Sequence, residues 1–255
     1  MAIAYKSFAE AKNPFLVTDI TINKPSGVVE NDLIVAVICL SGNGTVSSPA
    51  GWNGIQSSNT SAVSIATFYK VAGASEGASY LFTYSSGNEQ AYGFIIRFDG
   101  EDTTTPINIS GMTSGTSATP TCPSVTTTKD GCLILNLFGA DDHDVTIDDG
   151  EPSGTTVITV DESDNAGDAC SGGAAYLTQA NAGASGTAAF ALTASEEWIA
   201  ITVGIEPAGA ASPSPSPSAS ASPSASVSPS LSPSASPSPS ASVSPSLSPS
   251  ASLSP

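Results

Sequence analysis

The stretch 141–151, DDHDVTIDDGE, carries the densest set of side chains that could bind a cation or transfer a proton. It holds five aspartates, one glutamate and the only histidine of the chain, His143. Calcium takes about six to eight oxygen ligands from flexible loops, and this composition could supply them. The spacing departs from the EF-hand pattern, and the glycine-rich repeat of calcium β-rolls is absent. We weigh a solvated acidic loop against a Ca²⁺ site whose candidate ligands are Asp141, Asp142, Asp144, Asp148 and Asp149.

Catalysis through His143 would need an imidazole that accepts a proton. Acidic neighbours on both sides raise the pKa of His143 and favour the imidazolium, which cannot act as a general base. The chain also lacks a G-x-S-x-G nucleophile elbow, a phosphate-binding glycine loop and a dinucleotide-binding fingerprint. A carboxylate pair could hydrolyse a glycoside, but nothing marks two acids as buried and opposed. The sequence therefore predicts a protein that is not an enzyme and has no cofactor beyond the candidate Ca²⁺.

The acidic net charge of the chain excludes some classes of binding partner. The chain has 255 residues and a formal net charge of −17, with only six lysines and arginines. So few cations cannot neutralise a nucleic-acid backbone or hold an anionic membrane surface. The sequence shows no run of about 18 apolar residues and no apolar signal-peptide core near its start. We expect no nucleic-acid partner, no membrane insertion, and a protein that acts where it is made or leaves by lysis or a dedicated exporter.

Short runs of β-branched and aromatic residues recur between clusters of Gly, Asn, Ser and Pro, a pattern typical of antiparallel β proteins. Helix signals are weak, and the one helix-compatible stretch is 7–11. The predicted strands are 15–22, 32–40, 62–70, 79–84, 90–98, 124–127, 132–138, 155–161, 174–178, 187–193 and 198–205. Strands at this spacing favour a β-sandwich or jelly roll over a parallel α/β sheet.

Two parts of this pattern resemble one another. PSGVVENDLIVAVI (25–38) resembles PSVTTTKDGCLILNLF (123–138), and AYGFIIRFDG (91–100) resembles EWIAITVGIEP (197–207). In this alignment the acidic stretch replaces a neutral loop, SGNGTVSSPAGW.

The repeat predicts the domain organisation. We expect one antiparallel, jelly-roll-like β-sandwich domain over 1–207, built from two similar halves, about 15–100 and 119–207. Each half has about five strands, and because one apolar sheet face needs a second surface to cover it, the halves are expected to pack together.

The predicted core centres on two apolar runs. LIVAVICL (33–40) and CLILNLF (132–138) are nearly continuous in apolar residues, as expected of strands buried on both faces. Trp52 and Trp198 are interpreted as core residues rather than as platforms for a ligand.

The cysteines fall into two kinds of surroundings. Cys39 and Cys132 lie within the apolar runs and are interpreted as buried thiols. Cys122 and Cys170 lie in polar, turn-rich segments, where a disulfide between them is one hypothesis.

From 208 to 255 the chain contains only Ser, Pro, Ala, Val, Leu and one Gly, and SPSASVSPSLSPSAS occurs twice. Proline supplies no N–H and restricts the residue before it, so this composition predicts a disordered or polyproline-II-like tail. Such a tail could be a semi-rigid spacer, an O-glycosylated stalk or a plain solubilising linker.

The string KPSGVVENDLIVAVICLSGNGTVSSPAGWNGI (24–55) resembles phage and prophage virion proteins, which carry P-x-G-V-x-x-x-D-L-x-x-A followed by P-x-G-W. YKVAGASEGASYLFTY (69–84) and the closing EEWIAITVGIEP (196–207) continue the resemblance, which covers most of residues 20–207. Such proteins are common in tails, fibres and particle surfaces, often with Ser/Pro-rich low-complexity tails. The resemblance implies a non-enzymatic β-sandwich on a virion and includes no catalytic residue.

Two functions follow. The first is a structural or adhesive virion component, assembled in the host cytoplasm as a homo-oligomer or with other virion proteins, and in contact with a host-surface glycan. The alternative is a secreted or surface carbohydrate-binding module with a Ser/Pro linker, located outside the cell.

Overall fold

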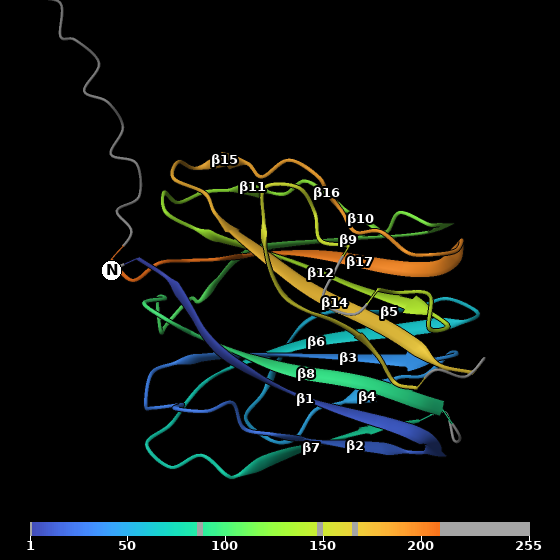
Figure 1. The fold of residues 1–255 in the computed structure, drawn as a ribbon. Helices are drawn as coiled ribbons and strands as arrows, with labels where there is room; N and C mark the ends of the chain where they lie inside the picture. Colours follow the sequence, from blue (N-terminus) through green and yellow to red (C-terminus); the bar gives the residue numbers. More distant parts are fainter. Residues whose placement is uncertain (1, 86–88, 147–149, 165–167, 210–255) are drawn as a thin grey trace, which may run out of the picture. The chain divides into compact units, whose positions relative to one another are not determined.

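The computed structural model describes residues 2–85, 89–146, 150–164 and 168–209, which form antiparallel β-sheets without a helix (Figure 1). The all-β prediction is confirmed. The tail prediction falls almost entirely on 210–255, outside the described residues. Over the described part, no helix is long and apolar enough to cross a membrane.

The first half of the chain forms one large and one small sheet. The large sheet has the order β1-β8-β3-β6-β5 and the small sheet the order β2-β7-β4, all antiparallel. The strands are β1 (Ala4–Val17), β2 (Asp19–Asn23), β3 (Leu33–Ser41), β4 (Val46–Ser47), β5 (Asn53–Asn59), β6 (Val63–Val71), β7 (Ser79–Tyr84) and β8 (Glu89–Asp99).

The second half repeats this arrangement. Its large sheet has the order β13-β14-β12-β17-β9, and its outer strands form the pairs β10-β16 and β11-β15. The strands are β9 (Ile107–Ser117), β10 (Thr121–Cys122), β11 (Thr126–Thr127), β12 (Leu133–Asp141), β13 (Thr156–Glu162), β14 (Cys170–Thr178), β15 (Gly183–Ala184), β16 (Ala188–Ala189) and β17 (Glu196–Ile205).

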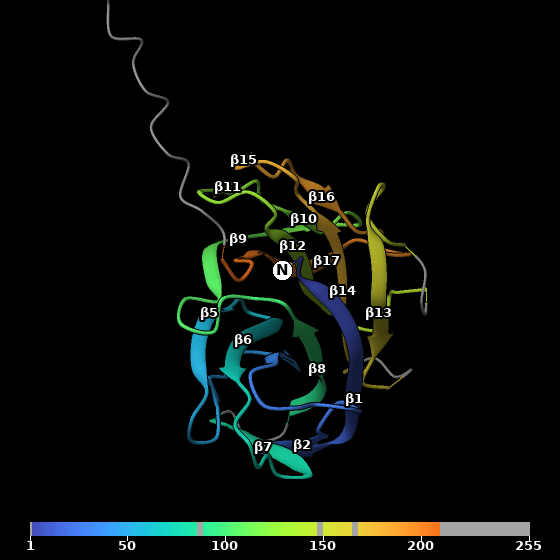
Figure 2. The same ribbon diagram turned by 90° about the vertical axis from the view of Figure 1, so that its left-hand side faces the viewer.

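The two large sheets pack face to face, and the short strands of each half cover the outer faces (Figures 1 and 2). Three hydrophobic clusters fill the layers: one lies between the large sheets, and one lies beneath the short strands of each half. The packed antiparallel sheets agree with the predicted β-sandwich, although the prediction did not specify the outer layers of short strands.

The central strand β3 is continuously apolar because both of its faces are buried. Leu33, Val35, Val37 and Cys39 belong to the cluster between the large sheets, and Ile34, Ala36, Ile38 and Leu40 belong to the cluster under the small sheet. Successive side chains of a strand point to opposite faces, so a strand between two packed layers must be apolar on both. Each such fully buried Leu or Ile side chain contributes roughly 1.5–3 kcal/mol to folding.

Irregularities recur at the same places in both halves. A register shift between Gly54 and Gln56 in β5 corresponds to one between Val157 and Thr159 in β13. A second shift, between Tyr5 and Ser7 opposite the end of β8, corresponds to one in β9 opposite the end of β17. The halves therefore share strand order and two bulge positions, whereas a further shift between Asn13 and Val17 in β1 has no counterpart in β9.

The turns that flank the central strands also correspond. Asn31 (φ 72°) precedes β3 and Gly131 (φ 74°) precedes β12, while Gly42 (φ 91°) follows β3 and Asp142 (φ 63°) follows β12. Glycine, asparagine and aspartate are the residues that tolerate this left-handed conformation best. The acidic stretch thus begins at a turn that the first half makes with glycine.

Several sequence predictions were wrong. Residues 4–14 of β1, all of β5 and all of β9 lay outside the predicted strands, and the strand predicted at 187–193 is reduced to Ala188–Ala189. The stretch 7–11, noted only as compatible with a helix, lies within β1. The disulfide hypothesis fails because all four cysteines are unpaired and buried, Cys122 and Cys170 included. The core assignments of Trp52 and Trp198 are confirmed.

Glu101 lies in the connection between β8 and β9 and is only 2 % exposed. Its backbone pairs with that of Pro207, so the connection between the halves is joined to the end of the second half. Neither carboxyl oxygen has a hydrogen-bond partner of good geometry among the described residues, although the backbone groups of Glu101 and Leu33 interact with it and partly offset the rise in its pKa. The nearby acids each have a cation: Asp32 contacts Arg97 at 2.6 Å and Asp99 contacts Lys6 at 2.8 Å.

Burial, and then the charges of Asp32 and Asp99, raise the pKa of Glu101 from 4.5 to about 7. In the unfolded chain Glu101 loses its proton near pH 4.5, whereas in the folded chain it keeps the proton up to about pH 7. Folding therefore becomes less favourable as pH rises from about 4.5 to 7. We expect the free energy of unfolding to fall by about 3 kcal/mol across this window. Glu101→Gln should remove that part of the decline, as measured by urea unfolding at pH 4 to 8.

Glu30→Gln, in an exposed turn, is the control and should keep the wild-type pH profile. If Glu101→Gln and wild type show parallel profiles, this account of Glu101 is wrong.

Candidate functional site

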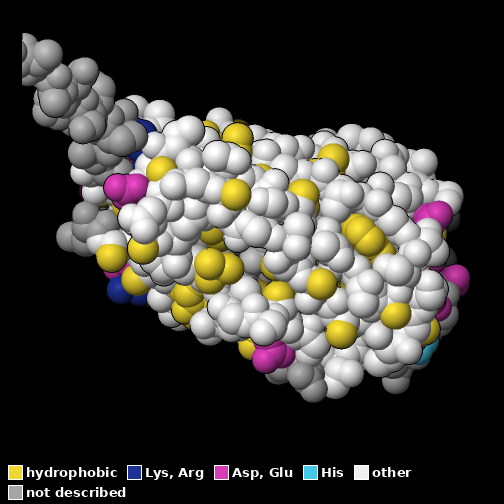
Figure 3. Space-filling model, turned by 90° about the horizontal axis from the view of Figure 1, so that it is seen from above, with side chains coloured by type: hydrophobic (Ala, Val, Ile, Leu, Met, Phe, Trp, Pro, Cys, Tyr) yellow, Lys and Arg dark blue, Asp and Glu magenta, His cyan; other side chains and the backbone are white. Residues whose placement is uncertain are grey.

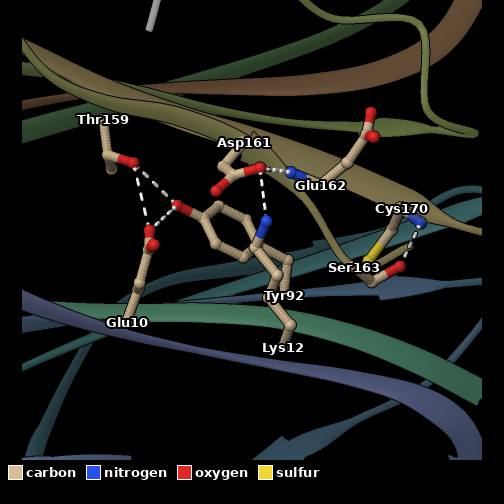
Figure 4. Close-up of polar contacts among 8 residues, drawn as sticks. All are labelled: Glu10, Lys12, Tyr92, Thr159, Asp161, Glu162, Ser163 and Cys170. Atoms are coloured by element: carbon tan, nitrogen blue, oxygen red, sulfur yellow. Dashed lines mark hydrogen bonds and ion pairs between the residues drawn. The ribbon is translucent and has the colours of Figure 1, made fainter. Parts of the chain in front are cut away.

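A set of polar contacts joins the halves where β1 meets β13, and we call it the β1–β13 seam (Figure 4). The hydroxyl of Tyr92 lies 2.8 Å from Oε2 of Glu10 and 2.8 Å from Oγ1 of Thr159. Beside it, Nζ of Lys12 donates to Oδ1 of Asp161 at 2.6 Å. The seam therefore holds an edge strand of the first large sheet against an edge strand of the second.

The polar contacts continue toward Cys170, the first residue of β14. Oγ of Ser163 donates to Oε1 of Gln90 at 2.9 Å and accepts a hydrogen bond from the backbone N of Cys170 at 3.0 Å. Sγ of Cys170 lies 3.3 Å from the carbonyl oxygen of Cys39, across the space between the sheets. Each of these contacts satisfies a buried polar group that would otherwise destabilise the fold.

Tyr92 determines what the seam can do. Its side chain is fully buried, and burial, followed by the charge of Glu10, raises the pKa of Tyr92 well above its usual value. The phenol stays neutral, and its buried hydroxyl is already engaged by Glu10 and Thr159. These properties suit a structural lock between the halves rather than acid–base chemistry on a substrate.

The opposite edges of the large sheets, β5 and β9, meet through uncharged groups. Nε2 of Gln56 donates to Oγ of Ser110 at 2.9 Å. Near the end of this contact, Glu197 of β17 accepts hydrogen bonds from Oγ of Ser61 and from the backbone N of Ala62, both at 3.0 Å. The halves are thus joined by polar contacts along both pairs of edges.

Removal of the Tyr92 hydroxyl should measure the strength of the β1–β13 seam. Tyr92→Phe leaves Glu10 and Thr159 without this partner, and we expect a loss of about 1–2 kcal/mol in the free energy of unfolding. Tyr69→Phe, at a partly buried tyrosine beside the same core, is the matched control. If urea unfolding gave Tyr92→Phe and Tyr69→Phe the same stability, the structural role assigned to the Tyr92 hydroxyl would be wrong.

The predicted Ca²⁺ ligands are only partly described. Oδ1 of Asp142 lies 2.5 Å from Nδ1 of His143, and Asp144 accepts a hydrogen bond from Thr193 at 2.8 Å. Burial raises the pKa of Asp141. Asp148 and Asp149 lie outside the described residues, and among those described no group of three or more His, Cys, Asp or Glu side chains could hold a metal ion. The Ca²⁺ site therefore stays a prediction.

His143 has the environment expected from its neighbours. The hydrogen bond with Asp142 raises the pKa of His143, which favours the protonated ring. This is the wrong state for a general base near neutral pH.

The Ca²⁺ hypothesis can be tested on the intact protein. Calcium at about 100 times its Kd would stabilise the fold by about 2.7 kcal/mol, so EDTA should lower the melting temperature. The pair Asp142→Asn and Asp144→Asn should abolish that response. Equal melting temperatures in Ca²⁺ and in EDTA would leave the stretch as a solvated acidic loop.

A groove lies between β4 and β5, and we call it the β4–β5 groove. It consists of two adjoining hollows of about 70 and 310 Å³ that share Val46 and Ser57. The lining residues are Gly44, Thr45, Val46, Gly54, Ile55, Gln56, Ser57, Ser58, Asn59, Ile65, Ala66, Thr67 and Phe68. None of them carries a charge, although the chain has 23 acidic residues.

The outer strands of the second half form a second uncharged surface. Residues 103–128 and 169–195 contain no Asp, Glu, Lys, Arg or His. Figure 3 looks down on this side of the molecule, where acidic side chains appear only toward the margins. We call it the uncharged outer face; its exposed residues on and beside the short strands are Ser124, Thr126, Thr128, Ala184, Gly186, Thr187 and Ala189.

Comparisons of the chain with protein-family models, with curated proteins and with solved structures found no match.

Sequence reasoning missed both the seam and the groove. Lys12 and Asp161 are 149 positions apart, so no local motif connects them. The groove residues carry no charge and form no recognisable motif, and only the alignment of the neutral loop with the acidic stretch concerned this region. Charge density instead directed attention to 141–151.

Proposed function

We propose that this protein is a non-enzymatic structural or adhesive component of a phage particle, in the tail, a fibre or the particle surface. It assembles with copies of itself or with other virion proteins in the host cytoplasm, and it binds targets through loops and outer surfaces. The observation that carries this proposal is the uncharged outer face on a chain of net charge −17.

Electrostatics gives this face its significance. Copies of a chain with this charge repel one another, which keeps them soluble and opposes association. Contact through a face that carries no charge keeps the acidic groups apart, and salt screens their repulsion beyond about 8 Å at physiological ionic strength. Such a face is the place where a strongly acidic protein can pack closely against a neighbour.

The residues of the outer face also suit assembly. They are Ser, Thr, Ala and Gly, whose side chains lose little conformational entropy when they are immobilised. Their small size favours close contact between backbones, and their hydroxyls supply hydrogen bonds. A large apolar surface, which would cause aggregation before assembly, is not needed.

The strand order supports the same proposal. In the first half, β1-β8-β3-β6 and β2-β7-β4 follow the order of a jelly roll in which β5 has joined the large sheet. We propose that both halves are copies of this module. Jelly rolls occur in viral capsid and lectin domains, an analogy at the level of fold that agrees with the resemblance of 24–55 to virion proteins.

A secreted or surface carbohydrate-binding module is the second candidate. The β4–β5 groove favours it, because neutral polar grooves suit sugar hydroxyls. Both candidates are binding proteins without bond chemistry, and they differ in whether the chain joins a particle.

Assembly can be tested by placing charge on the outer face. Thr126→Asp combined with Thr187→Asp should raise the dissociation constant of self-association at least tenfold, because each contact would then bury acidic groups. Light scattering of the full chain from about 1 to 100 µM, with electron microscopy of the assemblies, measures this.

Thr21→Asp, at an exposed position of β2 in the first half, is the control and should leave assembly unchanged. A wild-type chain that stays monomeric and joins no particle would contradict the virion proposal and favour the free-standing module.

A further inference from the structure

The β4–β5 groove exists because the first half lacks side chains that the second half has. Gly54 pairs with Phe68 just before the bulge of β5, and Val157 occupies the corresponding place in β13. The halves differ again one position after the bulge: Ser57 pairs with Ala66 in the first half, whereas its counterpart Val160 pairs with Gly173 in the second.

In the second half these valines fill the space. Val160 is 1 % exposed and belongs to the cluster under the outer strands, and Val157 packs against the same cluster. In the first half, Gly54 and Ser57 are exposed and line the open groove. A shared framework is thus closed by apolar side chains in one half and left open, with a polar lining, in the other.

The backbone does not require glycine at position 54. Gly54 lies outside the left-handed region, and a Cβ built on it would meet no atom within 4 Å. A valine is therefore sterically possible there, as in the second half. Neither a turn nor a close approach of the backbone explains the glycine.

The lining has the chemistry of a site for a neutral polyol. The exposed hydroxyls of Thr45 and Ser57 lie along it, and Asn59, whose amide donates to Asn43, lies at one end. The partly buried ring of Phe68 contributes an aromatic surface in the larger hollow. Hydroxyl and amide groups beside an aromatic ring match the alternating O–H and C–H groups of a sugar.

Other ligands fit less well. With no charged side chain in its lining, the groove offers neither a carboxylate for a cation nor an ammonium for an anionic sugar. An added peptide strand could pair with the edge strand β4 over only two residues, and the longer edge strand β5 already contacts β9 through Gln56 and Ser110. The larger hollow, at about 310 Å³, lies near the lower end of small-molecule sites.

We propose that the β4–β5 groove is a binding site for a neutral oligosaccharide, which contacts it through roughly one or two sugar rings. This inference rests on the proposed adhesive function and names its ligand class. Specificity for uncharged glycans follows from the neutral lining and from the −17 charge of the chain, which repels sialylated and sulfated forms.

The full chain should be tested on an array that pairs neutral glycans with their sialylated and sulfated forms, and the best neutral hit should then be titrated by NMR. We expect saturable binding to neutral members and at least tenfold weaker binding to their charged counterparts. Gly54→Val with Ser57→Val, which gives the groove the valines of the second half, should weaken binding at least tenfold.

Ser79→Val, at an exposed position of β7 outside the groove lining, is the matched control and should bind like wild type. Circular dichroism and melting temperatures should show that the valine variants are folded. The site is overturned if no neutral glycan binds, if charged forms bind as well, or if folded Gly54→Val/Ser57→Val binds like wild type.

The two proposals fail separately. Thr126→Asp with Thr187→Asp changes the opposite half and should leave the affinity of each chain for the neutral glycan unchanged. Particle assembly without glycan binding would overturn the groove alone. Glycan binding by a chain that never assembles would overturn the virion proposal and keep the groove.

Discussion

Close packing between the two large sheets is the constraint on which the rest of this fold depends. Where β12 and β14 face β3, a Cβ on Gly139 or on Gly172 would lie 2.9 or 2.8 Å from Sγ of Cys39, closer than atoms of this kind approach. Small residues therefore set the spacing of the sheets. Because the middle strands are covered on both faces, they are apolar almost throughout, with Asn136 of β12 a buried exception. Polar contacts between the halves are concentrated at the edges, in the β1–β13 seam and between β5 and β9.

This constraint explains which elements could be predicted from sequence. The runs at 33–40 and 132–138 must satisfy two apolar faces, so composition alone identified them. The edge strand β5, NGIQSSN, faces solvent or polar neighbours and carries no such pattern. β1 contains AEAK, which suits a helix in isolation, but its pairing with β8 over most of its length determines its conformation.

The candidate sites were hidden for a related reason. Tyr92 and Thr159 form their contact only after the halves pack, and the β4–β5 groove depends on the absence of side chains at Gly54 and Ser57. A small residue such as Gly54 does not indicate a groove by itself. Its role becomes visible only when the corresponding position of the second half, which holds a valine, is compared with it. The acidic stretch was conspicuous because charge is visible in sequence, whereas its described aspartates contact His143 and Thr193.

The residues around Gly100 have a mechanical consequence. Gly100 (φ 84°) lies against the carbonyl oxygen of Ala2, and its own carbonyl accepts a hydrogen bond from the backbone N of Ala208 at 2.8 Å. The start of the domain, its midpoint and its end thus converge, and a shallow hollow is lined by both Ala2 and Ala208. A pull applied between the two ends would load this small junction and the outer edge of β1 first. The stacked sheets would carry little of that force, so the domain can act as a rigid head on a tether attached at either terminus.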